Sequence, residues 1–336
     1  MKAYQIRGQF GLHHLELAEL PDPQPAIGEV VVRVRAVSLN YRDFLMVQGL
    51  YNPRQKLPLI PCSDGAGEIV AIGPGVTELK VGDRVVSVFA SGWQSGEPTR
   101  AKVSTTLGGP VDGMLAELRC LPVAAVAPAP THLDFAEAAT LPCAALTAWR
   151  ALVTEGQTKP GDTILVQGTG GVSIFALQIG KLLGARVIVT SSQDEKLARA
   201  LQLGAGHGIN YRTTPEWQKE ARALTGGVGV DHVVEVGGAG TFERSLQAVR
   251  MGGRVSCIGV LTGNAGPLSL IPILMQNLRV QGVLVGTRDE LIAMMKAFEQ
   301  HRLKPVVDKI FPFAEVGAAF EHLAAGRHFG KIAIAL

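Results

Sequence analysis

Apolar and polar positions follow a strand-and-helix rhythm through the second half of the chain. Thr163–Val166 is a short apolar run, and a glycine-rich turn over residues 168–171 follows it directly. From Val172 to Leu182 apolar residues recur every three or four positions, and Gly184 ends the run. This pattern predicts a buried strand, a tight turn and a helix that packs on a sheet.

The same unit then repeats. Further strands are predicted at Val187–Thr190, Ile209–Tyr211, Val233–Val236, Arg254–Ile258 and Val280–Val285. Helical stretches lie between these strands, among them Asp194–Leu203. Strands that alternate with helices imply a parallel sheet with right-handed crossovers, and six strands are what a doubly wound dinucleotide-binding (Rossmann) sheet requires.

The first part of the chain has a different pattern, with short strands and few helices. Strands are predicted at Ala3–Ile6, Leu15–Leu17, Glu29–Ser38, Ile69–Ile72 and from Val81 to Phe89. The first two form a predicted hairpin, and a short helix opens at Asn40 and runs to Gln48. The chain is therefore predicted to be an α/β protein with a separate β-rich region.

The glycine turn carries the first candidate chemistry. A strand, a glycine turn and a helix N-terminus bind pyrophosphate well, because free N–H groups and the helix dipole both favour negative charge. Ser173 stands at the third position of the G-x-G-x-x-G pattern, where a small residue can serve. A tight turn without a ligand is the alternative. The predicted pyrophosphate contacts are Gly168, Thr169, Gly170, Gly171 and Val172.

The end of the second Rossmann strand indicates which dinucleotide binds. An NAD site usually carries Asp or Glu there, but this chain has Ser191 and Ser192, with Lys196 on the next helical turn and Tyr211 at the end of the third strand. Hydroxyl groups and a cation suit a 2′-phosphate, so NADPH is predicted over NADH. The alternative is that the serines cap the next helix and Lys196 is a solvated surface charge.

Composition narrows the class of protein. The chain has 336 residues, which is long enough for two domains. Of these residues 47% are apolar and 18% are charged, as in a globular protein with a large core. A net charge of +3 gives no nucleic-acid footprint, and no apolar span predicts a membrane helix or signal segment. The four cysteines lack CxxC spacing. A cytoplasmic protein with neither nucleic-acid nor membrane partners is expected.

Four motifs in order resemble the medium-chain dehydrogenase/reductase superfamily. They are Gly73–Val76, Gly82–Val85, Leu141–Trp149 and the turn at Gly168–Gly171. The chain is most similar to the zinc-free quinone oxidoreductase branch. This resemblance implies a partly open, GroES-like catalytic domain over residues 1–122 and 287–336, and a Rossmann NADP(H)-binding domain over residues 123–286.

The positions that hold catalytic zinc in relatives are altered here. Zinc alcohol dehydrogenases of this superfamily use Cys, His and Cys, with Glu beside the His. The matching positions in this chain are Asn40, Ser63-Asp64 and Cys143. One thiol cannot hold zinc tightly, because a catalytic site needs about three protein ligands. No metal is therefore expected.

Without a metal, reduction of an activated acceptor is easier than oxidation of a plain alcohol. Gln48–Tyr51 resembles the turn of enoyl reductases in the superfamily, which makes Tyr51 the first candidate proton donor and Asn40 the second candidate catalytic residue. By the same resemblance, further cofactor contacts are expected at Thr147, Gly259, Val260, Leu261 and Lys331. For Tyr51 the alternative is a wall of the cleft, and for Lys331 a surface charge.

These observations predict an oxidoreductase that uses NADPH without zinc to reduce quinones or α,β-unsaturated carbonyl compounds. Two alternatives stay open: an alcohol dehydrogenase with unrecognised zinc ligands, and a non-catalytic NADPH-binding or sensing protein. The resemblance also implies a homodimer that pairs through Leu268–Met275 and Val280–Val285.

Overall fold

The computed structural model describes residues 1–336, which separate into two compact units. Unit 1 comprises Met1–Leu146 and Gly286–Leu336, and unit 2 comprises Thr147–Val285. The first division lies at Leu146, later than the predicted residue 122. The reason is that β7 (Val126–Pro128) pairs with β5 (Arg84–Ser87) and so belongs to the sheet of unit 1.

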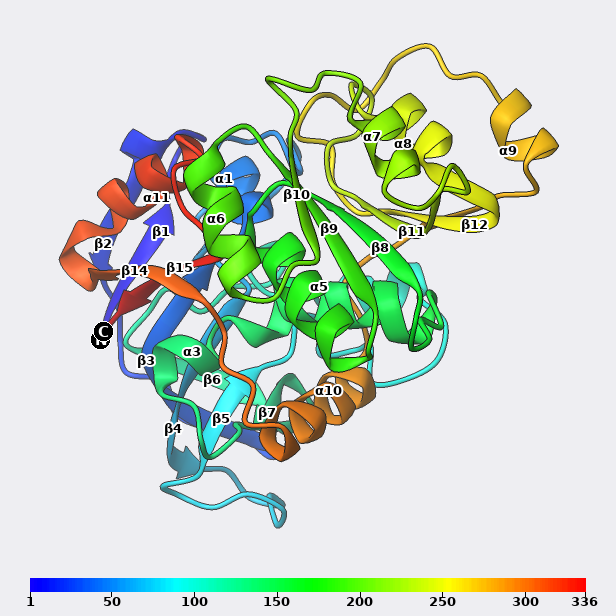
Figure 1. Ribbon diagram of the computed structural model, residues 1–336. Coiled ribbons are helices and arrows are strands. Elements are labelled where there is room, and N and C mark those ends of the chain that lie inside the picture. The colour runs from blue at the N-terminus through cyan, green and yellow to red at the C-terminus, as the bar shows by residue number, and fades with distance from the viewer. The chain divides into compact units, whose positions relative to one another are not determined.

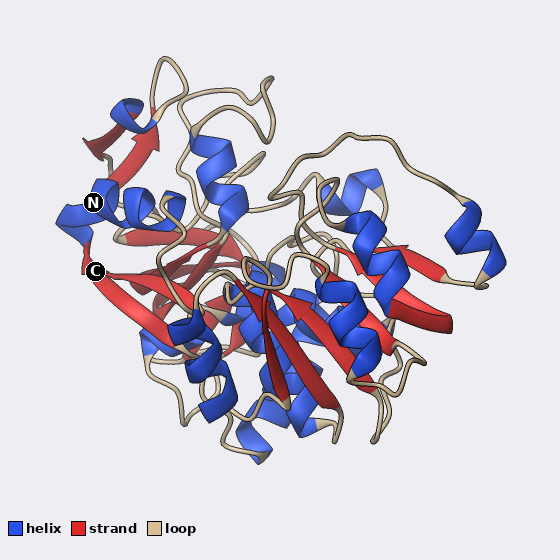
Figure 2. Ribbon diagram, turned by 45° about the horizontal axis from the view of Figure 1, so that its top comes forward, coloured by secondary structure: helices blue, strands red, loops and turns tan.

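Unit 2 is the predicted Rossmann domain (Figures 1 and 2). Its strands are β8 (Thr163–Gln167), β9 (Arg186–Ser191), β10 (His207–Asn210), β11 (Val230–Glu235), β12 (Val249–Cys257) and β13 (Arg279–Gly282). They pair in the order β10-β9-β8-β11-β12-β13, all parallel. This is the dinucleotide-fold order 3-2-1-4-5-6, with the reversal between β8 and β11.

Helices flank this sheet, as Figure 2 shows in blue beside red strands. They are α5 (Gly171–Leu182), α6 (Asp194–Gln202), α7 (Trp217–Ala223), α8 (Phe242–Ala248) and α9 (Ile271–Met275). A π-helical turn, Arg150–Thr154, precedes them. Helix α5 packs closely on the sheet because Gly180 has no side chain, and a Cβ there would lie 2.8 Å from Val187 Cγ2. The apolar strand residues Leu165, Val233 and Val255 form the buried core.

Unit 1 is built on a seven-stranded sheet and a separate hairpin. The hairpin is β1 (Lys2–Ile6) with β2 (Leu15–Glu19), as predicted. The sheet contains β3 (Glu29–Leu39), β4 (Asp64–Ile72), β5, β6 (Leu118–Pro122), β7, β14 (Val307–Pro312) and β15 (Lys331–Ala335). Strand β4 begins at Asp64, earlier than the predicted Ile69, because Asp64 already pairs with Ser38 of β3.

The helices of unit 1 are short except near the C-terminus. They are α1 (Tyr41–Val47), α2 (Arg100–Val103), α3 (Phe135–Ala138), the π-helical turn Leu141–Ala145, α10 (Arg288–Gln300) and α11 (Val316–Ala324). Helix α4 (Leu146–Trp149) contains the division between the units. No helix in the chain combines the length and the apolar character that crossing a bilayer requires.

Strand β3 holds the centre of unit 1 and positions the candidate site. Its last residues pair with β15, so that Leu39 lies opposite Ile332 and Ser38 opposite Ala333. Lys331, the first residue of β15, precedes Ile332 and therefore lies beside the end of β3. Residues almost three hundred positions apart in sequence are therefore neighbours where α1 begins.

Candidate active site and cofactor site

Lys331 is a buried lysine at the end of β3, with 3% of its side chain exposed. Its Nζ donates hydrogen bonds of 2.6 Å to Leu39 O and 2.6 Å to Asn40 Oδ1. Burial lowers the pKa of Lys331, while the nearby Asp64 carboxylate acts against that shift. The alternative that Lys331 is a surface charge is wrong.

Two carboxyl groups, Asp64 and Asp43, are completely buried near Lys331. Asp64 Oδ1 accepts from Ser63 Oγ at 2.6 Å, and Asp64 Oδ2 accepts from the Cys143 backbone N–H at 3.1 Å. Burial raises the pKa of Asp64 to about 6, although Lys331 and hydrogen bonds from Ser63 and Asn40 oppose the rise. Asp64 is therefore a carboxyl group that can exchange a proton near neutral pH.

Asp43 fixes the start of α1. Its Oδ2 accepts from the Asn40 backbone N–H at 2.9 Å, and its Oδ1 accepts from Arg42 Nη1 at 3.1 Å. Arg42 is itself buried and donates to the carbonyl oxygens of residues 107–109. We call Lys331, Asp64, Asn40, Asp43 and Arg42 the charge cluster.

Tyr51 lies beside this cluster and remains accessible. Its side chain is 44% exposed, and the Arg42 guanidinium carbon lies 4.9 Å from the centre of its ring. The turn that carries Tyr51 needs Gly49, which has φ +71° and whose added Cβ would lie 2.6 Å from Phe10. The phenol thus stands at the surface of unit 1, held against a buried cation.

The residues that the sequence resemblance matches to zinc ligands, Asn40, Ser63-Asp64 and Cys143, do not fit a zinc ion. Asn40 Oδ1 is occupied by the Lys331 ammonium, and burial raises the pKa of the Cys143 thiol, which keeps it protonated. No group of three His, Cys, Asp or Glu side chains in the chain could hold a metal. The positively charged Lys331 ammonium therefore contacts one of these positions, Asn40.

Several large apolar side chains of unit 1 belong to its core. Met46, Phe89 and Trp93 are each at most 2% exposed, and Phe44 is partly buried. Phe89 packs under Arg42, whose guanidinium carbon lies 5.4 Å from the ring centre.

In unit 2 the glycine turn forms an open cradle at the start of α5. Gly168 has φ +72°, and a Cβ added to Gly168 or Gly170 would meet nothing within 4 Å. Gly170 is the N-cap of α5, and no side chain caps the first helical turn. The space and the free N–H groups together fit a pyrophosphate. We call residues 168–172 the cofactor turn; within it, Thr169 is buried and Val172 half-buried.

Ser173, at the third glycine position of the motif, points its side chain away from the cradle. Its side chain is buried, and Oγ donates to Gln167 O at 2.6 Å. The hydroxyl therefore closes the turn from inside rather than occupying the cradle.

The residues predicted to select the dinucleotide gather near the end of β9. Ser191 is buried and its Oγ accepts from Gln193 N at 3.3 Å, while Ser192 and Lys196 are half-buried. Tyr211 is 42% exposed, and its backbone N–H donates to Ser191 O at 3.0 Å. The N-cap of α6 is Gln193, so neither serine occupies the capping position that the alternative required.

A buried polar network that sequence reasoning missed lies at the ends of β8 and β11. Gln167 Nε2 donates to Glu235 Oε2 at 2.6 Å, and Glu235 Oε1 accepts from the backbone of Gly237 and Gly238 at 2.7 and 2.9 Å. Ser245 Oγ also donates to Glu235 Oε2. The only sequence signal was one carboxylate inside an apolar strand. The network fixes the loop after β11.

The loop after β12 is tied to the loop after β11. Thr262 N donates to Gly237 O at 2.7 Å, and a Cβ on Gly259 would lie 2.4 Å from Val236 O. Val260 and Leu261 are left 49% and 53% exposed. Thr147, at the start of unit 2, is buried. These loops follow the carboxyl ends of the strands, the edge where open α/β sheets bind ligands.

The fold and these two sites define the class of protein. Residues 26–131 match the family model of the alcohol dehydrogenase GroES-like domain, and residues 171–300 match that of the zinc-binding dehydrogenases. The chain belongs to the medium-chain dehydrogenase/reductase superfamily, and it is an oxidoreductase of the zinc-type alcohol dehydrogenase-like family.

Three relatives illustrate the range of the family. A zinc-type alcohol dehydrogenase-like protein of Schizosaccharomyces pombe is 42% identical over 96% of both chains. A crystal structure described as an NAD-dependent alcohol dehydrogenase is 37% identical, with a TM-score of 0.92 and full coverage of both chains. Acryloyl-coenzyme A reductase of Metallosphaera sedula is 30% identical over 99% of both chains.

Proposed function

We propose that this protein uses NADPH, without a metal, to reduce the activated double bond of α,β-unsaturated carbonyl compounds or quinones. The observation that carries the proposal is the charge cluster, in which the Lys331 ammonium donates to Asn40 at a former zinc position. The relative from Metallosphaera sedula supports the substrate class, because acryloyl-coenzyme A is an activated alkene.

A bound nicotinamide dinucleotide would supply the hydride. The residues of this chain then have to bind the acceptor, orient it and support the negative charge that develops on its carbonyl oxygen. An enone tolerates the absence of a strong Lewis acid, because hydride addition at its far carbon spreads charge into an enolate. A plain alcohol cannot delocalise charge in this way, so its oxidation without a metal is the less favourable reaction here.

Tyr51 is the proposed proton donor to the enolate. It is exposed enough to reach a substrate, and Arg42 lies against its ring at 4.9 Å. Tyr51→Phe should lower turnover far more than it changes KM, because the phenyl ring keeps the packing and loses only the hydroxyl. Full turnover by the variant would exclude Tyr51 as the donor.

Asn40 has a supporting role in this proposal. Its Oδ1 is fixed by Lys331, and its side chain helps to hold down the pKa of Asp64. Asn40→Ala should weaken turnover by disordering the cluster, whereas Asn40→Asp should pair with Lys331 and retain the arrangement. Measured pH profiles of kcat for both variants separate positioning from direct chemistry.

The preference for NADPH rests on the absence of a carboxylate at the end of β9. Ser191 and Ser192 stand there, with Lys196 one turn further on. A similar structure is described as an NAD-dependent alcohol dehydrogenase, so the choice of dinucleotide is tested directly. Ser192→Asp combined with Lys196→Ala should shift the ratio of kcat/KM values toward NADH, and an unchanged ratio would remove this account of the 2′-phosphate site.

The direct test of the reaction class is product identification. The protein is supplied with NADPH deuterated at the transferable position and with one conjugated enone or one quinone. A saturated ketone deuterated at the far carbon would establish double-bond reduction. Quinone turnover alone would favour electron transfer without a need for Tyr51. Tight NADPH binding without turnover of either acceptor would favour the sensing protein instead.

We further propose that the protein is a cytoplasmic homodimer. The segment around α9 exposes large apolar side chains, including Ile271, Leu274 and Met275, each at least 68% exposed. Strand β13 is the edge of its sheet, and its residues are exposed. Sedimentation at micromolar concentration should give a dimer, and Leu274→Glu should shift it toward the monomer.

A further inference from the structure

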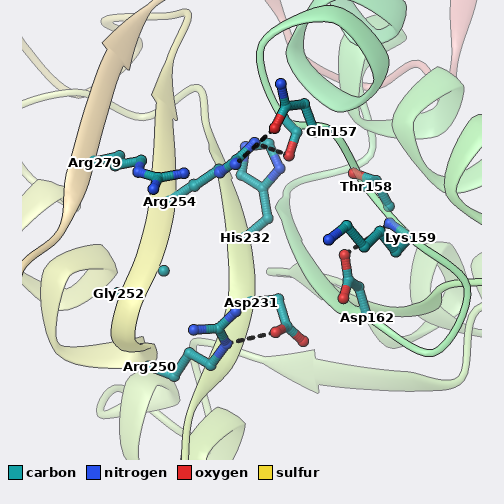
Figure 3. Close-up of a pocket in the computed structure, with 12 residues that line it drawn as sticks. Gln157, Thr158, Lys159, Asp162, Asp231, His232, Arg250, Gly252, Arg254 and Arg279 are labelled. Carbon is teal, nitrogen blue, oxygen red and sulfur yellow. Dashed lines mark hydrogen bonds and ion pairs between the residues drawn. The ribbon is translucent and has the colours of Figure 1, made fainter.

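We propose that unit 2 carries a second binding site, for a phosphate-class oxyanion, in the pocket that Arg254, Arg279 and His232 line at the amino edge of its sheet (Figure 3). The pocket lies at the start of β11, β12 and β13, whereas the cofactor turn follows the end of β8. The two sites are therefore at opposite edges of one parallel sheet.

Strand register places the three key side chains in one row. His232 of β11 is paired with Arg254 of β12, and Arg254 is paired with Arg279 of β13. Side chains at paired positions of neighbouring parallel strands point to the same face. Figure 3 shows these residues on adjacent strands, with Gln157 and Lys159 on the segment that faces them.

The charges in this pocket are unbalanced. Four cationic side chains and two carboxylates line it, which leaves a formal charge of 4 − 2 = +2. These six residues are Lys159, Arg250, Arg254, Arg279, Asp162 and Asp231. Asp231 is already engaged, because its Oδ1 accepts from Arg250 Nε at 2.6 Å and its Oδ2 from Thr163 N at 2.7 Å. Asp162 Oδ2 accepts from the Lys159 backbone N–H at 2.8 Å. Neither carboxylate therefore forms an ion pair with the two paired arginines.

Neither Arg254 nor Arg279 forms an ion pair, although the charge of Asp162 acts to raise the pKa of Arg254. Arg254 donates only to neutral oxygens. These are the backbone carbonyl oxygens of Glu155, at 2.8 Å, and Gly156, and the side-chain amide oxygen of Gln157, at 3.3 Å. Burial lowers the pKa of Arg254, and the neighbouring Arg279 charge lowers it further. Two guanidinium groups at paired positions repel each other, and an oxyanion between them would relieve that repulsion with charge-assisted hydrogen bonds.

His232 forms a buried wall of this pocket. It is 3% exposed; its Nε2 is 2.8 Å from Ser256 Oγ, and its Nδ1 is buried without a hydrogen-bond partner. A buried polar atom without a partner costs about 1–3 kcal/mol. Because Nδ1 is closed off from the pocket, an anion between the arginines would act on the His232 ring through its electric field and not through a direct hydrogen bond.

The size of the pocket favours a small anion. Its volume is about 270 Å³, which is below the range of roughly 300–1,000 Å³ typical of sites for larger organic ligands. Inorganic phosphate or the phosphate group of a small monoester would fit with a few waters, and a second dinucleotide would not.

The test measures the melting temperature of the full chain against the concentration of inorganic phosphate, with ionic strength held constant by chloride. Binding to the folded state should raise the melting temperature along a saturable curve. Arg279→Gln should weaken phosphate binding about tenfold, because it removes one charge-assisted partner. Arg279 is exposed and has no structural hydrogen bond to lose, so the variant should fold. The matched control is Arg327→Gln, an exposed arginine of unit 1.

A parallel titration with glycerol 2-phosphate separates the two sources of the phosphate group, and the tighter binder identifies the source. In the nitrogen NMR spectrum of the histidines, the His232 signal should move as phosphate saturates. The proposal is overturned if phosphate and chloride have equal effects at equal ionic strength. It is also overturned if Arg279→Gln responds to phosphate like the unmodified protein, because the anion would then bind elsewhere.

Discussion

The charge cluster of unit 1 and the cofactor turn of unit 2 are built in opposite ways. The cluster depends on side chains, because a lysine from β15 meets an asparagine that precedes α1 and carboxylates that are completely buried. The cofactor turn depends on missing side chains, because Gly168 and Gly170 leave open space before uncapped N–H groups. One site is full of protein charge, and the other offers backbone dipoles to a charged ligand.

This difference means that the two sites should respond differently to mutation. In the cluster the cations Lys331 and Arg42 compensate the buried carboxylates Asp64 and Asp43, so the loss of a cation leaves buried negative charge without compensation. In the cofactor turn the free protein loses little from an added methyl group, because the methyl group fills only the space for the ligand. Stability should therefore report on the first site and ligand affinity on the second.

The largest effect is expected for Lys331→Met. The change removes two hydrogen bonds of 2.6 Å and leaves Asp64 and Asp43 buried without the ammonium. Loss of one member of a buried charge group costs about 3–5 kcal/mol of unfolding free energy, measurable by urea denaturation at pH 8. The exposed Lys80→Met is the control, expected to change stability by less than about 0.5 kcal/mol. Equal values for the two variants would contradict the cluster.

Asp64→Asn should change how stability depends on pH. The folded-state pKa of Asp64 is raised to about 6, above its unfolded value of about 3.9. The folded protein therefore binds this proton more tightly, and the resulting stability is present below pH 4 and lost as pH rises through 6. The loss is of order 3 kcal/mol at most.

The measurement is the unfolding free energy of both proteins between pH 4 and pH 8. The unmodified protein should lose stability relative to Asp64→Asn across this interval, because the amide cannot ionise. A constant difference between the two proteins would show that Asp64 titrates normally in the folded state.

The smallest effect is expected for Gly170→Ala. Gly170 has φ −77° and ψ −176°, which alanine adopts without strain, so stability should change by less than about 1 kcal/mol. The new Cβ would stand in the cradle and weaken NADPH binding by about tenfold or more, equivalent to about 1.4 kcal/mol. Gly317→Ala in α11, also next to open space, is the control and should leave binding unchanged.

Local patterns predicted unit 2 well and unit 1 less well. The apolar runs and glycines located all six Rossmann strands and the cofactor turn, because the pattern of residues within each short segment is enough to predict that element. The pairing of Lys331 with Asn40 depends on β15 returning to β3, which only the family resemblance suggested. Sequence could name Lys331, but it could not show that the side chain is buried beside Asp64.

The Gln167–Glu235 network and the pocket of Arg254 and Arg279 escaped prediction for a related reason. A polar residue inside an apolar strand does not reveal which neighbours satisfy it until strand order is known. The register that aligns His232, Arg254 and Arg279 links three strands separated by crossovers. Such rows are properties of the sheet and not of any one segment.

The central claim, that the charge cluster works without a metal, is tested most directly by activity after metal removal. Protein is purified, treated exhaustively with a strong chelator, analysed for zinc and assayed with NADPH and a conjugated enone. The account predicts far less than one zinc per chain and turnover equal to that of the untreated protein. Tightly bound zinc whose removal abolishes turnover, and whose return restores it, would contradict the account.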